Sequence, residues 1–96
     1  MKYNKSEPIT DLLHQYLRAE GLETPLNEYR VVSTWPDVVE EVVAKATGKI
    51  FIKNQILNVQ IKSPVIRQEL MMRRHDLVQK LNAIVGAAVI IDIRLF

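Results

Sequence analysis

The sequence predicts an α+β domain in which helices cover one face of a three-stranded mixed sheet. Two runs of alternating apolar and polar residues flank Asn54-Gln55, which is typical of a β-hairpin. A third alternating run closes the chain over residues 88–96. Stretches with apolar residues three and four positions apart precede the hairpin and separate it from the last run. The expected order is therefore α-α-α-β-β-α-β, a two-layer sandwich.

The length and composition suit one ordinary globular domain. The chain has 96 residues, and we expect a flexible N-terminus over 1–5 and a single domain over 6–96. It has no cysteine, which excludes disulfides, thiolate catalysis and cysteine-based zinc sites. No apolar run approaches the roughly 18 residues that a membrane span needs, and the first residues lack the apolar core of a signal peptide. We therefore expect a cytoplasmic protein.

Three helices are expected before the hairpin. Ser6 caps the first and Gly21 ends it. Its apolar stripe consists of Ile9, Leu12, Leu13, Tyr16 and Leu17. The second begins at Thr24-Pro25 and should end at Trp35, because a residue that precedes a proline is disfavoured in the α conformation. The third begins at Pro36, and Trp35 is expected to anchor the core at the corner between them.

Each strand should turn one row of side chains to the core and the other to an open face. The core row of the hairpin is Ile50, Ile52, Leu57, Val59 and Ile61, and that of the last strand is Val89, Ile91, Ile93 and Leu95. One helix connects these strands: Ser63 caps it, Pro64 is its first residue and Gly86 ends it after Val85. Such a crossover connection makes the last strand parallel to the second, although its neighbour in the sheet stays open. The apolar arc of this helix contains Ile66, Leu70, Leu77, Leu81 and Ile84. The open face would carry Lys49, Phe51, Lys53, Ile56, Asn58, Gln60, Lys62, Ile90, Asp92, Arg94 and Phe96.

The net charge of +2 is unevenly distributed along the chain. Residues 1–44 contain four basic and eight acidic side chains, a net charge of −4. Residues 45–80 contain eight basic and two acidic side chains, a net charge of +6. Such a chain can present an anion-binding face and a separate face for a basic partner, although solvated surface charge explains the same distribution.

No grouping of residues typical of catalysis is found in the sequence. His14 and His75 lack a second ligand at metal-binding spacing. Gly48-Lys49 lacks the first glycine and the final Ser or Thr of a phosphate-binding loop. The adjacent carboxylates Glu40-Glu41 diverge on a helix and do not form an acid/base pair. We therefore expect a non-enzymatic protein with no cofactor and no metal.

The remaining residues favour nucleic-acid binding. The candidate site residues are Lys45, Lys49, Phe51, Lys53, Lys62, Arg67, Arg73 and Arg74. Lysine and arginine contacts to phosphates give affinity that is independent of base sequence and falls with salt. Phe51 and Phe96 would either stack bases or fill a sheet edge or a dimer contact. Arg67 and Arg74 lie near the apolar arc, where each either covers the core with its stem or reaches a phosphate.

A set of short segments keeps a particular order and spacing along the chain. They are Trp35-Pro36-x-Val38-Val39, Thr47, Leu57-x-Val59, Ser63, Gln68-Glu69-Leu70, Leu81-Asn82, Gly86 and Ile93-Arg94. Together they resemble the DciA family of bacterial proteins, over roughly residues 8–96. Glu40 stands where the family often has a glycine, and Ile66 stands at about the place of a frequent aromatic residue.

The resemblance implies a K-homology-like domain, although the G-x-x-G loop of nucleic-acid-binding K-homology modules is absent. It also implies a role in loading the replicative helicase without ATPase chemistry, through contacts to the helicase and to DNA. We therefore expect an adaptor of DNA replication. Two alternatives stay open. One is a general single-stranded RNA- or DNA-binding module. The other is a structural homodimer formed through an apolar patch of Phe51, Ile56, Ile90 and Phe96 on the open face.

Overall fold

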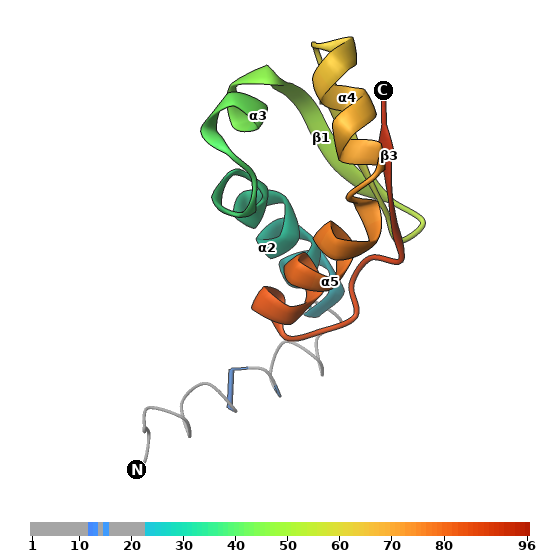
Figure 1. Ribbon diagram of the computed structural model, residues 1–96. Coiled ribbons are helices and arrows are strands. Elements are labelled where there is room, and N and C mark those ends of the chain that lie inside the picture. The colour runs from blue at the N-terminus through green and yellow to red at the C-terminus, as the bar shows by residue number, and fades with distance from the viewer. Residues whose placement is uncertain (1–11, 14, 16–22) are drawn as a thin grey trace.

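The computed structural model describes residues 12, 13, 15 and 23–96 (Figure 1). Its elements are α2 (Glu23–Val38), α3 (Glu41–Ala46), β1 (Thr47–Lys53), β2 (Ile56–Ile61), α4 (Pro64–Met71), α5 (Arg74–Val85) and β3 (Asp92–Leu95). Leu12, Leu13 and Gln15 are helical and exposed. The rest of the first predicted helix, and the predicted flexible terminus, lie outside the described residues.

The three strands form one mixed sheet in the order β1-β2-β3. β1 and β2 are antiparallel, and the turn between them has φ angles of 53° at Asn54 and 64° at Gln55. A two-residue turn with two left-handed residues matches the twist of the strands that it joins. β2 and β3 are parallel, so the helices between them form the crossover. The predicted α+β class, the hairpin and the mixed three-stranded sheet are confirmed, and the structure adds the neighbour of the last strand, which is β2.

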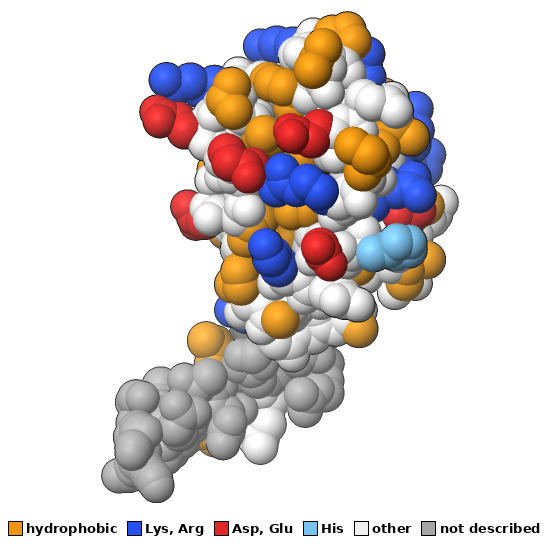
Figure 2. Space-filling view, viewed as in Figure 1, with side chains coloured by type: hydrophobic (Ala, Val, Ile, Leu, Met, Phe, Trp, Pro, Cys, Tyr) orange, Lys and Arg blue, Asp and Glu red, His pale blue; other side chains and the backbone are white. Residues whose placement is uncertain are grey.

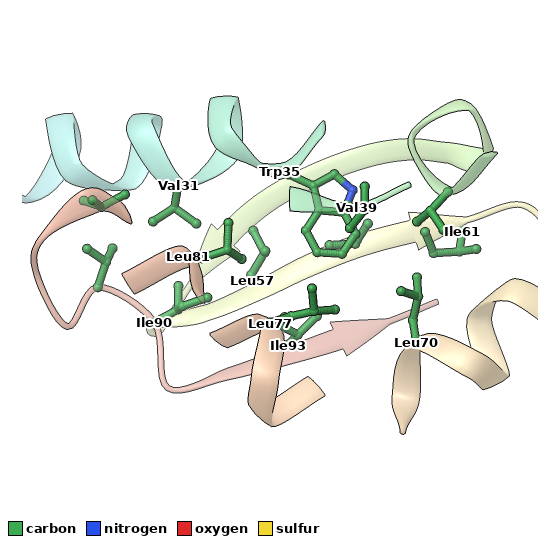
Figure 3. Packing of buried hydrophobic residues seen from close by; sticks show 14 residues of the cluster. Val31, Trp35, Val39, Leu57, Ile61, Leu70, Leu77, Leu81, Ile90 and Ile93 are labelled. Carbon is green, nitrogen blue, oxygen red and sulfur yellow. The ribbon is translucent and has the colours of Figure 1, made fainter. Parts of the chain in front are cut away.

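The core lies between the helices and one face of the sheet (Figure 3). Leu57, Val59 and Ile61 of β2 are almost completely buried there, as the alternation predicts. Trp35 is 1% exposed, and its indole Nε1 donates a hydrogen bond to Oγ1 of Thr47 over 3.1 Å. Burial with its one polar atom satisfied is what an aromatic core anchor requires. The predicted burial of Trp35 in the core is confirmed.

Trp35-Pro36 does not divide two helices, and this prediction was wrong. α2 continues through Pro36 to Val38, and the break falls at Val39 and Glu40. Pro36 is exposed and lies in the last turn of α2, where a single missing backbone hydrogen bond disturbs few neighbours. Trp35 therefore stays helical and shares the buried face of α2 with Val31, one turn earlier.

The long helix predicted over 64–85 is two helices, because the chain turns at Met72 and Arg73. Arg73 has φ −108° and ψ 9°, which is outside the helical conformation. The turn starts a new buried stripe in α5, made of Leu77, Leu81 and Val85. Ile84, which the uninterrupted pattern placed in the core, is 55% exposed, so its predicted burial was wrong.

The last strand is shorter than predicted, because Asn82 holds the segment before it in an irregular turn. Asn82 Oδ1 accepts hydrogen bonds from the backbone N–H groups of Val89 and Ile90, over 3.0 and 3.2 Å. Its Nδ2 donates to the carbonyl of Ile90 over 2.8 Å. Val89 and Ile90 are both buried and Ile91 is 66% exposed. The predicted alternation was therefore wrong for Ile90 and Ile91, and it holds from Ile93 onward.

Candidate nucleic-acid interface

The side of the sheet opposite the core carries polar, basic and aromatic residues, and we call it the open sheet face. Its members on the strands and at their ends are Lys49, Phe51, Lys53, Ile56, Asn58, Gln60, Lys62, Asp92, Arg94 and Phe96. Asp92 lies in the row of Lys53 and Ile56, and its carboxylate pairs with Arg74. The register places Phe51 beside Asn58, and Asn58 beside Arg94, in one row across the three strands. Ile90 was expected on this face, but it belongs to the core.

A β-bulge shapes one end of the open sheet face. Thr47 pairs with Ile61 while Ile50 pairs with Val59, so Gly48 and Lys49 together oppose Gln60. The Gln60 side chain fills the bulge, and its Oε1 accepts a hydrogen bond from the backbone N–H of Lys49 over 3.0 Å. It also lies against Gly48, where an added Cβ would collide with it. A bulge of this kind increases the local twist and redirects the side chains of the strand.

Two aromatic rings and an arginine meet at the centre of the open sheet face. The rings of Phe51 and Phe96 pack edge to face, with centroids 6.3 Å apart and planes at 64°. The guanidinium of Arg94 lies 4.9 Å from the centroid of the Phe96 ring. Its Nη1 donates a hydrogen bond to Asn58 Oδ1 over 3.1 Å. Asn58 was expected to be exposed, but it is only 6% exposed because the neighbouring side chains cover it.

Three lysines surround this cluster. Lys49 and Lys53 lie on β1, and Lys62 directly follows β2; all three are exposed. None of them takes part in the ion pairs found among residues 23–96. Three ammonium groups without a carboxylate partner in the described part of the chain attract an anion more strongly than the same groups would if each were paired.

Two other predicted site residues have partners within the protein. Lys45 forms an exposed ion pair with Glu41, one turn earlier in α3, with Nζ and Oε2 3.3 Å apart. Arg67 donates a hydrogen bond from Nη1 to the backbone carbonyl of Ile61 over 2.7 Å. This contact holds α4 against the end of β2, so the guanidinium of Arg67 already has a structural role.

Arg73 and Arg74 also face carboxylates of this chain. Arg73 Nη1 lies 3.2 Å from Glu40 Oε1, and this pair joins the start of α3 to the turn between α4 and α5. A backbone hydrogen bond at Glu40 and the hydrogen bond from Arg73 hold the pKa of this carboxyl below its ordinary value of 4.5. Arg74 Nε lies 3.8 Å from Asp92 Oδ1 and is buried without a hydrogen-bond partner among the described residues.

The helical face of the molecule is different in character from the open sheet face. Figure 2 shows basic, acidic and apolar side chains interspersed over the helices.

The structure brings together four residues of the predicted site on the open sheet face, namely Lys49, Phe51, Lys53 and Lys62. It places Lys45, Arg73 and Arg74 beside carboxylates, and Arg67 against a backbone carbonyl.

Arg94 was not among the candidate site residues, although it lies at the centre of the open sheet face. The alternation of the last run already turned Arg94 and Phe96 outward together. The register of this strand could not be predicted from the alternation, and only the register places Arg94 beside Asn58 and near Phe51. Its proximity to Phe96, two residues later on the same strand, was the one local indication.

Other kinds of site receive no support from the part of the chain that the structure describes. Among those residues no three His, Asp or Glu side chains are grouped as metal ligands would be. No helix within the described ranges has the length and apolar character needed to cross a membrane.

Comparisons with known proteins give one match. No curated protein and no solved structure matches the chain significantly. The family model described as Dna[CI] antecedent, DciA, matches residues 8–95, which is nearly the whole sequence. Membership implies a helicase-loader type of role in DNA replication, and the family is not known as a family of enzymes. The chain belongs to the DciA family.

Proposed function

We propose that this protein is a non-enzymatic adaptor that contacts the replicative helicase and binds DNA weakly through the open sheet face. Family membership supports the link to helicase loading. The observation that carries the DNA-binding part is the placement of Lys49, Lys53 and Lys62 around one solvent-facing surface, without carboxylate partners among the described residues. Such groups bind phosphates by releasing counterions, with no need for base recognition.

The fold separates two surfaces that an adaptor needs. The open sheet face lies on one side of the sheet, and the helices α2, α3 and α5 lie on the other (Figure 1). DNA on the sheet would therefore leave the helical face free for a protein partner. A homodimer through the open sheet face is less favourable, because it would bring the lysines of two copies together.

The helicase contact is tested with purified components. The protein is mixed with the replicative helicase of the same bacterium, and the helicase retained on immobilised single-stranded DNA is measured. We expect more retained helicase in the presence of the protein. Equal retention with and without it, together with no co-elution of the two proteins, would contradict the adaptor role.

The DNA contact is tested by changing Lys49, Lys53 and Lys62 together to Glu. We expect DNA affinity to be abolished and the circular dichroism spectrum and melting temperature to be nearly unchanged, because all three side chains are exposed. An unchanged dissociation constant would rule out the open sheet face as the DNA site. Helicase co-elution should survive this change, which separates the two parts of the proposal.

A further inference from the structure

The centre of the open sheet face is more than a set of charges, because it presents planar groups in a defined arrangement. Phe51 is 43% exposed although it packs edge to face against Phe96. Arg94 lies over the Phe96 ring, at 4.9 Å from its centroid. One side of the guanidinium thus packs on the Phe96 ring, while the Arg94 residue is exposed to solvent.

Asn58 holds the Arg94 guanidinium in this position. Its Nδ2 donates to the carbonyl of Ile56 over 2.9 Å, and its Oδ1 accepts from Arg94 Nη1 over 3.1 Å. Because Asn58 is buried, this hydrogen bond is protected from competition with water. Arg94 is therefore held over Phe96 before any ligand arrives, and less conformational entropy is lost on binding.

The charges around the cluster indicate which ligand it suits. A neutral apolar ligand would gain nothing from Lys49, Lys53 and Lys62. In a dimer formed through this face, the lysines of one copy would repel those of the other. A flexible polyanion that carries flat, apolar rings satisfies both features at once. Unpaired nucleotides have this chemistry, and their bases stack on aromatic rings and on arginine planes.

We propose that Phe51, Arg94 and Phe96 form a stacking site for unpaired nucleobases. This inference rests on the proposed DNA contact and specifies it: the lysines hold the phosphates, and the cluster receives bases. Every base has a π face, so the site would accept any base, whereas bases paired inside a duplex cannot reach it. Each stacked base would tighten binding by roughly 5- to 150-fold.

The test compares three labelled probes of equal length by fluorescence anisotropy with the full chain. The probes are an oligothymidylate strand, an abasic strand with the same phosphates, and a duplex. We expect the thymidylate strand to bind at least about fivefold tighter than the abasic strand. Phe51→Ala and Phe96→Ala should remove this difference and leave abasic binding unchanged. Tyr29→Ala is the matched control, because Tyr29 is an exposed aromatic residue on α2.

Arg94→Lys separates stacking from charge and does not depend on the stability of the phenylalanine variants. Lysine keeps the charge but lacks the planar guanidinium. We expect the preference for the thymidylate strand to decrease and binding of the abasic strand to stay the same. If both strands weaken equally, Arg94 contacts phosphates and the stacking proposal is wrong.

The remaining outcomes also decide the matter. Equal affinity of the wild-type protein for the thymidylate and abasic strands would overturn the stacking site and leave the lysine-mediated DNA contact intact. No binding to any probe would overturn both. A dimer in sedimentation that Phe51→Ala dissociates would mean that a second copy covers the face, which would also overturn the proposal.

Discussion

At the scale of single residues, Trp35 and Asn82 contribute to the fold through different interactions. Trp35 fills the core and satisfies its indole N–H at Thr47. Trp35→Ala should lower the free energy of unfolding by about 3–5 kcal/mol, because it removes a large buried ring and leaves a cavity. Urea denaturation measures this change. Tyr29→Ala, at an exposed aromatic residue, should have little effect, and a similar loss in both variants would contradict the role given to Trp35.

Asn82 holds the backbone of Val89 and Ile90 with one amide group. Asn82→Ala leaves buried backbone groups without partners, which should lower the free energy of unfolding by about 2 kcal/mol or more. Asn82→Asp keeps the acceptor for the two N–H groups and should cost less. Equal stability of the alanine variant and the wild type would show that water replaces the amide.

Contacts between residues that are close in the sequence were predicted, whereas contacts between residues that are far apart in the sequence were not. Ser63 accepts a hydrogen bond from Ile66 N–H at the start of α4, and Gly86 ends α5 with φ 85°, both as predicted. Asn82 bonds to backbone groups seven and eight residues later, and no spacing rule identifies such a contact. The contact of Arg94 with Asn58 depends in the same way on the strand register.

At the scale of elements, the bulge in β1 controls how the strand presents its lysines. Gly48→Ala would force the Gln60 side chain away and remove the acceptor of the Lys49 N–H. We expect a loss of about 1–2 kcal/mol in the free energy of unfolding. With Gln60→Ala already present, Gly48→Ala should cost much less, since the colliding side chain is gone. Additive effects in this double-mutant cycle would mean that the backbone, and not Gln60, requires glycine.

The contact between α3 and the turn after α4 gives a prediction about pH. Glu40 has a lowered pKa in the folded protein, so its ionised form stabilises the fold. This contribution is present above the ordinary value of 4.5 and is lost as the pH falls through the lowered folded value. Glu40→Gln should therefore lower the melting temperature near neutral pH and have no effect in strong acid. In an Arg73→Met background the difference at neutral pH should be smaller; an unchanged difference would mean that Arg73 contributes little.

The boundaries of the helices were predictable only where the sequence marks them. Pro64 lies at the start of α4 and Gly86 follows α5, and each residue suits its position. The turn at Met72 and Arg73 contains neither Gly nor Pro, and tertiary packing of α5 on α2 sets its place. Pro36 was misleading in the other direction: a proline usually ends a helix, but here it lies inside α2.

At the scale of the whole molecule, the fold divides a basic segment into residues with different roles. The sequence shows the +6 charge of residues 45–80, but not which of these cations pair within the protein and which lie on the open sheet face. The four candidates Lys45, Arg67, Arg73 and Arg74 have partners within the protein, whereas Lys49, Lys53 and Lys62 surround the open sheet face. The salt dependence of DNA binding should therefore correspond to about three phosphate contacts, and not to all eight cations of this segment.

The most direct measurement compares two variants with the same change in charge. Lys49→Glu with Lys53→Glu changes the open sheet face, and Lys45→Glu with Lys80→Glu changes exposed lysines on helices. Binding to single-stranded DNA is followed by anisotropy across a salt series for both variants and for the wild type. The proposed interface predicts that the first pair weakens binding strongly and reduces the salt slope, while the second pair weakens binding only slightly and leaves the slope nearly unchanged. Equal losses from the two pairs would contradict it, because DNA would then respond to net charge and not to this surface.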